Sequence, residues 1–170
     1  MQGLDTEYFR PVTGQGSGSA RPLLPVGFHR ATLPQVKRLC VEGFTTSVSR
    51  PLLMQTLGGI IDLLNRGGFP AVLWVEGAFL TDSENPPTFD ATLVLTEEVL
   101  SRLTPSQADL VDWFCTTTLA DSYRCNNYMV VLDAARRDGT IMRAYWLRQF
   151  GLDTADGGGV LEILIPSLVR

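Results

Sequence analysis

A short uninterrupted apolar run, Ala71-Val72-Leu73-Trp74-Val75, constrains the fold of this chain more than any other segment. Consecutive apolar residues without polar alternation are typical of a strand that is buried on both faces. A sheet with two covered faces needs helices on each side. The run therefore predicts an α/β architecture.

Two helical patterns precede this strand. Thr32, Pro34 and Gln35 form a capping-box start, because Thr32 can cap the first turn and proline tolerates its missing N–H there. Within residues 49–65 the apolar residues recur at helical period, which predicts a second helix. Gly67-Gly68 favours the end of that helix. The apolar side of that second helix is expected to carry Leu52, Leu53, Leu57, Ile60, Ile61 and Leu64.

Further strands and helices alternate after the central run. We expect strands over residues 88–95, 128–132 and 160–165, and helices from 96, over 104–119 and over 138–150. Asn85-Pro86-Pro87 is expected to be a loop, because proline cannot donate to a sheet. The whole pattern predicts an α/β (α+β) fold, a mixed sheet of about four strands flanked by helices.

The length of 170 residues fits one domain. Residues 1–22 are expected to be a flexible tail, because residues 13–19 are rich in glycine and serine. Residues 23–170 are expected to form the single folded domain. Three cysteines without a CxxC spacing indicate neither a disulfide framework nor a zinc site.

The net charge of −4 argues against duplex nucleic acid as a partner, because each phosphate contact needs a local positive charge. The first residues contain acids and no apolar core of a signal peptide. No apolar stretch is long enough to cross a bilayer. We therefore expect a cytoplasmic protein without a membrane partner.

The segment from Val72 to Leu95 holds the candidate site. Gly77 and Ala78 follow the first strand, and small residues there let backbone N–H groups approach a phosphate. Asp90 and Thr92 lie two residues apart on the next strand, so their side chains point to the same face. Taken alone, Asp90 is better explained as a solvated strand-edge residue than as a site residue, and Gly77 is consistent with a tight turn after a strand.

This segment resembles the active-site hairpin of nucleotidyltransferases of the DNA-polymerase-beta type, whose signature is Gly-Ser, a spacer and Asp-x-Asp. Over residues 25–165 the chain also resembles a family of small, largely uncharacterised bacterial proteins of that fold. The shared motifs, in order, are Gly27-x-His29-x-Ala31-Thr32, Glu76-Gly77-Ala78-Phe79-Leu80-Thr81, Pro87-Thr88-Phe89-Asp90, Trp146-x-x-x-Phe150-Gly151 and Gly159-Val160-Leu161-Glu162-Ile163.

The resemblance implies a magnesium site on Asp90 and on a third carboxylate from a neighbouring strand, for which Asp133 is the candidate. It implies nucleotide contacts by Gly77, Ala78 and Thr92. Asp133 is equally consistent with a residue that ends a strand, and Glu76 and Glu162 are poorer candidates because they adjoin strands without clear convergence. His29 has no metal-site partner and is expected to pack or to hydrogen-bond.

Two departures from the signature favour a loss of catalysis. Ala78 replaces the serine, and Thr92 replaces the second aspartate, although Mg²⁺ depends on anionic oxygen ligands. The first hypothesis is a catalytically impaired domain that acts as a binding or regulatory module with a protein partner, in a toxin–antitoxin or phage-defence setting. The second is an active Mg²⁺-dependent enzyme that moves a nucleotide from an NTP to a protein, an RNA or a small molecule.

Overall fold

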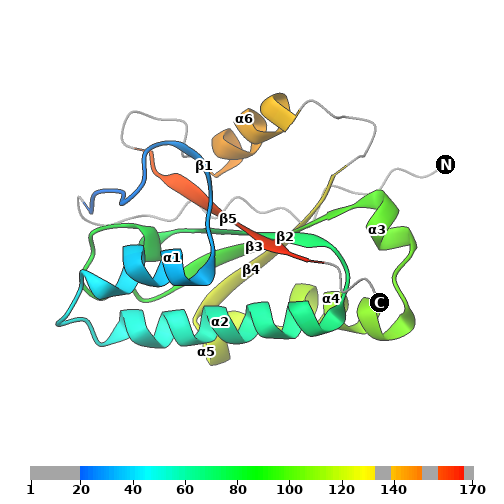
Figure 1. The fold of residues 1–170 in the computed structure, drawn as a ribbon, viewed down its shortest axis with the longest axis horizontal. Coiled ribbons are helices and arrows are strands. Elements are labelled where there is room, and N and C mark those ends of the chain that lie inside the picture. The colour runs from blue at the N-terminus through cyan, green and yellow to red at the C-terminus, as the bar shows by residue number, and fades with distance from the viewer. Residues whose placement is uncertain (1–19, 133–138, 151–156, 167–170) are drawn as a thin grey trace.

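Five strands of this chain form one mixed sheet with helices on both faces (Figure 1). The computed structural model describes residues 20–132, 139–150 and 157–166. In chain order the elements are β1 (Gly27–Arg30), α1 (Leu33–Lys37), the π-helix η2 (Arg38–Glu42), α2 (Ser49–Gly67), β2 (Ala71–Glu76), the 3-10 helix η3 (Ala78–Leu80), β3 (Phe89–Thr96), α3 (Glu97–Ser101), α4 (Pro105–Thr116), α5 (Leu119–Tyr123), β4 (Cys125–Leu132), α6 (Gly139–Gln149) and β5 (Gly159–Ile165).

The strand order in the sheet is β1-β5-β2-β3-β4. β2 lies antiparallel to both β5 and β3, whereas the two outer pairs, β1 with β5 and β3 with β4, are parallel. The expected count of about four strands missed β1. Four residues that include His29 and Arg30 carry little strand signal, and parallel pairing with β5 supplies what local propensity does not.

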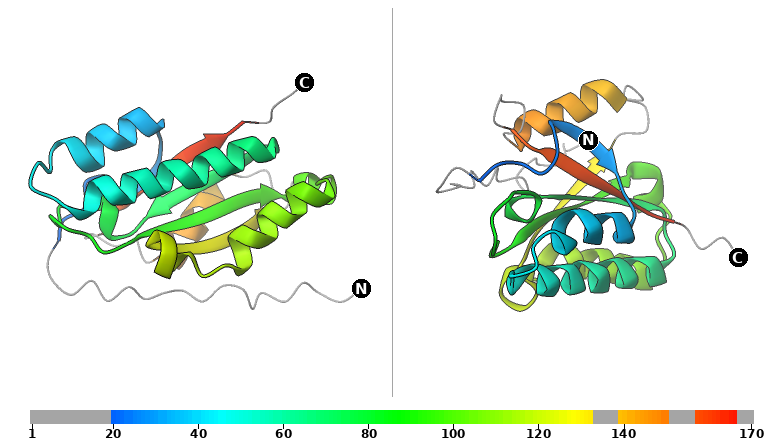
Figure 2. Two further views of the ribbon diagram at one scale, coloured as in Figure 1. Left: turned by 90° about the horizontal axis from the view of Figure 1, so that it is seen from below. Right: turned by 60° about the vertical axis from the view of Figure 1, so that its left-hand side comes forward.

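One face of the sheet packs on α1, α2, α4 and α5 (Figures 1 and 2). α2 begins at Ser49 as expected and ends at Gly67, and the C-cap residue Gly68 has a φ of 69°, the left-handed conformation of a helix exit. The prediction for Leu52 was wrong, since its side chain is 52% exposed. Leu52 lies about 100° around the helix from Leu53, which places it outside the buried stripe. That stripe consists of Leu53, Leu57, Ile60, Ile61 and Leu64.

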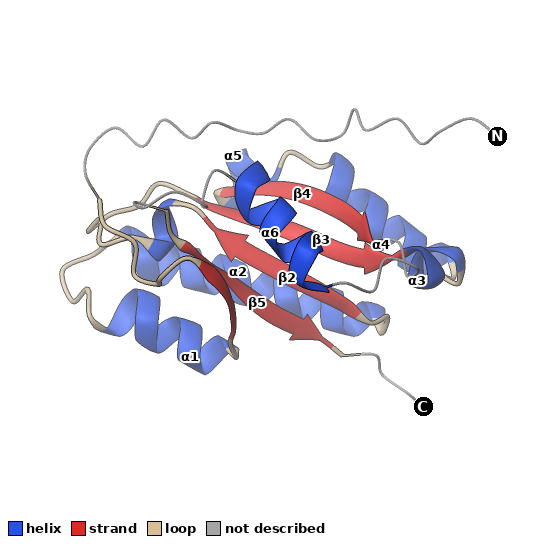
Figure 3. Cartoon of the chain, turned by 90° about the horizontal axis from the view of Figure 1, so that it is seen from above, coloured by secondary structure: helices blue, strands red, loops and turns tan. Residues whose placement is uncertain are grey.

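The opposite face of the sheet is crossed by α6 (Figure 3). Trp74 from β2 and Trp146 from α6 are buried there with Val94, Val130 and Val160. The ring of Phe150 packs edge-on against Trp74 at 6.1 Å between centroids. These aromatic side chains belong to the hydrophobic core on this face of the sheet.

Two boundaries near β4 differ from the sequence expectation. α4 ends at Thr116, and Thr117 is extended with ψ of 131°, so the helix does not run on to residue 119. β4 begins at Cys125, three residues before the expected start at Tyr128. Threonines weaken the end of the helix, and the pairing of β4 with β3 overrides the poor strand propensity of two asparagines.

Residues 21 and 22, which the sequence assigned to the tail, contact the loop after η3. The Arg21 backbone N–H donates to Asp82 Oδ1 at 2.7 Å, and its guanidinium Nε lies 3.3 Å from Asp82 Oδ2. Pro22 forms an isolated antiparallel bridge with Thr81. These contacts attach the segment before β1 to the β2–β3 connection.

Candidate functional site

The candidate site is built on the antiparallel pair β2 and β3. β2 ends at Glu76, the chain turns at Gly77, and β3 returns so that Asp90 pairs directly with Glu76. Asp90 is half-buried and lies against the turn, because a Cβ added to Gly77 would be 2.6 Å from Asp90 Oδ2. The structure therefore brings Gly77 and Asp90 together, as the sequence predicted.

Asp90 and Thr92 point to the same face of the sheet as Val94, which packs with Trp146 of α6. Thr92 is 1% exposed, and its Oγ1 has no hydrogen-bond partner. Ala78 lies in η3, where its carbonyl accepts a hydrogen bond from Thr81 Oγ1 at 2.8 Å. Thr92 thus shares the site of Asp90, whereas Ala78 belongs to the turn beside it.

β4 supplies the neighbours of Asp90 on its other side. Asn126 pairs with Asp90, and Tyr128 pairs with Thr92. The Asn126 amide Nδ2 donates to Asp90 Oδ1 at 2.5 Å. Sequence reasoning missed Asn126 because asparagine is uncommon in strands. The β4 positions beside Asp90 and Thr92 therefore carry an amide and a phenol, not a carboxylate.

The proposed third carboxylate, Asp133, lies outside the described residues. Leu132, the last residue of β4, pairs with Thr96. Thr96 is six residues along β3 from Asp90, which is about 20 Å on an extended strand. The carboxylate that the structure does place against Asp90 is Glu76.

Burial governs the electrostatics of this pair. Removal from water, and then the nearby Asp90, raises the pKa of Glu76 to about 9. The pKa of Asp90 is also raised by burial, and the hydrogen bond from Asn126 opposes that shift. Burial, followed by the charges of Asp90 and Glu76, raises the pKa of Tyr128 to about 12. Two carboxyl groups thus share a poorly solvated site in which one of them stays protonated at neutral pH.

Glu162, the other acidic residue on this face, has its own partners. Its Oε1 lies 3.3 Å from Arg30 Nη2, and its Oε2 accepts a hydrogen bond from Trp74 Nε1 at 3.4 Å. The predicted poor convergence of Glu162 with Asp90 agrees with this placement, because Glu162 pairs with Trp74 on β2. The same expectation for Glu76 was wrong, since the antiparallel register puts it opposite Asp90.

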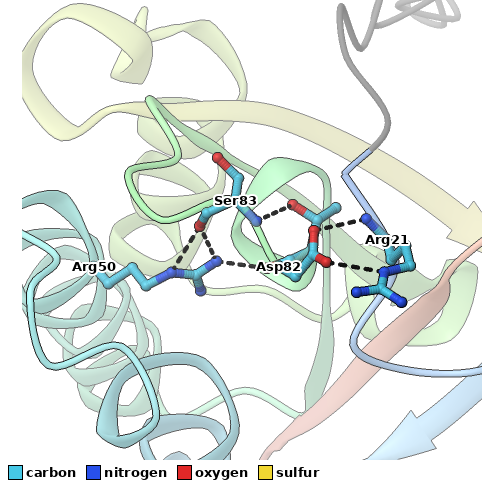
Figure 4. Close-up of polar contacts among 5 residues, drawn as sticks. Arg21, Arg50, Asp82 and Ser83 are labelled. Carbon is cyan, nitrogen blue, oxygen red and sulfur yellow. Dashed lines mark hydrogen bonds and ion pairs between the residues drawn. The ribbon is translucent and has the colours of Figure 1, made fainter.

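A buried arginine positions the loop that follows the turn (Figure 4). Arg50, at the start of α2, is 0% exposed and stacks over the Phe44 ring, with its Cζ 3.5 Å from the ring centroid. Burial lowers the pKa of its guanidinium. The guanidinium donates to the carbonyl oxygens of Cys40, Phe79, Thr81 and Ser83, at 2.5–3.1 Å. Arg50 therefore holds η2, η3 and the β2–β3 loop in one arrangement.

Gly77 allows a specific test of the turn. Gly77→Ala is expected to lower the free energy of unfolding by about 2 kcal/mol or more, because φ is +87° and the new methyl group would collide with Asp90. Urea denaturation measures the effect. Gly59→Ala is the matched control, because nothing lies within 4 Å of the added Cβ in α2; it is expected to be neutral or stabilising. Equal effects at the two positions would contradict the strained turn.

Other kinds of site receive no support in the described part of the chain. Among those residues, no three His, Cys, Asp or Glu side chains lie together in a way that could hold a metal ion. His29 Nε2 lies 2.8 Å from the Pro25 carbonyl oxygen, which confirms its hydrogen-bonding role. Nor does any described helix combine the length and apolar character needed to cross a bilayer.

Comparisons with known proteins identify a family but no activity. The model of a family of unknown function, DUF6932, matches residues 18–164. No curated protein and no solved structure matches the chain. These comparisons therefore assign no chemistry to the site.

Proposed function

Because the chain belongs to the DUF6932 family of unknown function, we propose its function from the site: a polymerase-beta-type nucleotidyltransferase domain that no longer transfers nucleotides and acts as a binding module. The order of elements supports this fold. A strand, a glycine turn and an antiparallel strand carry the carboxylate, and helices then lead to a parallel strand beside it.

One observation carries the loss of catalysis. The positions that surround Asp90 on β3 and β4 are occupied by Thr92, Asn126 and Tyr128, none of which is an anion at neutral pH. Phosphoryl transfer depends on positioning and on charge neutralisation by metal ions that anionic oxygens hold. A single aspartate on β3 does not provide the ligands for a two-metal reaction.

The binding role that we propose is with a protein partner, in a toxin–antitoxin or phage-defence pair. Co-expression with the product of an adjacent gene, followed by size-exclusion chromatography, tests this role. We expect the two chains to co-elute as one complex. Separate elution of two folded proteins would argue against a partner encoded beside this chain.

A direct assay tests the loss of transfer. We expect no label on protein, RNA or small acceptors after incubation with α-³²P-labelled NTPs and Mg²⁺. We also expect no heat in a calorimetric titration of ATP into Mg²⁺-containing wild type or Asp90→Ala. The absence of signal in both proteins follows if the site lacks the charges that hold a metal–triphosphate complex.

The second candidate function, an active Mg²⁺-dependent nucleotidyltransferase, is favoured by Glu76, which faces Asp90 across the strand pair. It predicts metal-dependent binding of ATP by the wild type and its loss in Asp90→Ala. Transfer of label by the wild type would decide for this candidate. Circular dichroism spectra of both proteins control for folding.

A further inference from the structure

β4 lies at one edge of the sheet, and among the described residues its only strand partner is β3 (Figure 3). All eight residues of β4 pair with β3 in one continuous register without a bulge. Every second residue of such a strand turns its backbone N–H and C=O away from the sheet. The outer side of β4 therefore presents a row of backbone donors and acceptors with which another strand can pair.

The two edges of the sheet differ in their protection against such pairing. Natural edge strands are normally short, or they carry charged residues, proline or a bulge. β1, at the other edge, has four residues and includes the exposed Arg30. β4 has eight residues, Cys-Asn-Asn-Tyr-Met-Val-Val-Leu, with no charged residue and no proline. Near its end, the apolar side chain of Val131 is 37% exposed. β4 thus lacks each of these protections.

A second copy of β4 fits this edge when the two strands run antiparallel about a two-fold axis. Such an axis makes the interface self-complementary, so one open edge on each chain closes the assembly at a dimer. The whole chain carries a net charge of −4, but β4 itself brings no like charges into opposition. The uncharged strand therefore lets two acidic chains meet without repulsion across the strand pair.

The residues at the two ends of β4 carry opposite charges. Arg124 precedes the strand, is exposed, and makes no ion pair with the described residues. Asp133 follows the strand in the sequence. An antiparallel pair brings the first end of each strand beside the last end of the other, so the positive end of one copy meets the negative end of its partner. A parallel pair would instead place like charges together.

We propose that this chain forms a homodimer in which the β4 strands of two copies pair antiparallel and join the two five-stranded sheets into one. Backbone hydrogen bonds along the edge supply the attraction, as in other cases of strand addition. Pairing also removes Val131 from water, because its side chain then lies beside the strand of the other copy. The dimer depends neither on nucleotide transfer nor on a second kind of protein.

Sedimentation equilibrium of the full chain, from about 1 to about 200 µM, tests the dimer. We expect a reversible monomer–dimer equilibrium with a Kd on the order of 10–100 µM, because an edge-to-edge contact buries less surface than a standard interface. Val131→Lys is expected to weaken dimerisation at least about tenfold, because lysine on an edge strand opposes pairing. Val48→Lys is the matched control, since Val48 is 75% exposed but caps α2; its Kd is expected to equal that of the wild type.

A charge exchange tests the orientation of the two strands. Arg124→Asp is expected to weaken the dimer by roughly three- to tenfold, because acidic residues then meet at both ends of the strand pair. Adding Asp133→Arg to Arg124→Asp is expected to restore the affinity. Failure of this double variant to recover would overturn the antiparallel pairing. Circular dichroism controls for folding, and if Val131→Lys does not fold, the charge exchange alone decides.

Three results of the sedimentation experiment would overturn the dimer. These are a wild type that stays monomeric at every concentration, a Val131→Lys variant that dimerises as well as the wild type, and a Val48→Lys variant that is weakened equally. A monomeric wild type would leave the β4 edge to an extended segment of another protein. Because the experiment contains one protein only, its outcome is separate from those of the co-expression test and the transfer assay.

Discussion

Replacement of Arg50 by methionine is expected to lower the free energy of unfolding by about 3–5 kcal/mol. The guanidinium is fully buried and gives five hydrogen bonds to four backbone carbonyl groups. Methionine fills much of the same volume but donates none of these bonds. The carbonyl oxygens of Cys40, Phe79, Thr81 and Ser83 would then lose a donor in a region that water barely reaches.

Equilibrium urea denaturation, followed by tryptophan fluorescence, measures this loss. Arg66→Met is the matched control, because Arg66 is exposed in the last turn of the same helix; its effect is expected to stay within about 0.5 kcal/mol. Arg50→Lys keeps the charge but cannot reach four carbonyl groups, so its free energy of unfolding is expected to lie between those of Arg50→Met and wild type. A loss below about 1 kcal/mol for Arg50→Met would show that the loop does not depend on this arginine.

The stability advantage of Glu76→Gln over wild type is expected to increase as the pH rises. The folded-state pKa of Glu76, about 9, lies above its ordinary value of 4.5, so the folded protein binds this proton more tightly than the unfolded chain. The stability contributed by protonated Glu76 is complete below pH 4.5 and is lost as the pH rises toward 9. Between pH 5 and pH 7 the difference in free energy of unfolding between Glu76→Gln and wild type is expected to grow by roughly 3 kcal/mol.

Urea denaturation of both proteins in EDTA, at several pH values from 5 to about 9, measures this difference. Asp90→Asn serves as the companion variant, because it removes the charge that helps to raise the pKa of Glu76. In Asp90→Asn the pKa of Glu76 is expected to be lower, so the loss of stability caused by ionisation of Glu76 is expected to be complete at a lower pH than in wild type. If the difference in free energy of unfolding between wild type and Glu76→Gln stays constant over this pH range, Glu76 is not a buried carboxyl with a raised pKa.

Local patterns in the sequence were sufficient for most elements of the fold. The apolar run of β2, the period of α2 and the capping box at Thr32 of α1 each predicted an element that the structure contains. These signals are local, because they arise from burial and from backbone capping within one segment. β1 was missed because its four residues become a strand only through pairing with β5.

The candidate site was only partly predictable for a related reason. Alternation along one strand placed Asp90 and Thr92 on the same face. The pairing of Asp90 with Glu76 and Asn126 depends on the registers of β2 and β4, which are set by a long loop and by a helical crossover. No local property of Glu76 or Asn126 reveals those registers. Side-chain chemistry was therefore readable from the sequence, whereas convergence across strands was not.

The position of β5 in the sheet has a consequence for biosynthesis. β5 is the last described strand, yet it lies between β1 and β2, and Arg30 meets Glu162 across 132 positions of chain. A nascent chain that already contains β2, β3 and β4 still has an open edge on β2, and β1 has no neighbour to join. Long-range closure of this kind slows folding and leaves apolar edges accessible. We infer that the sheet closes only after residue 165 has left the ribosome, and that chains cut short before β5 are targets for chaperones and proteases.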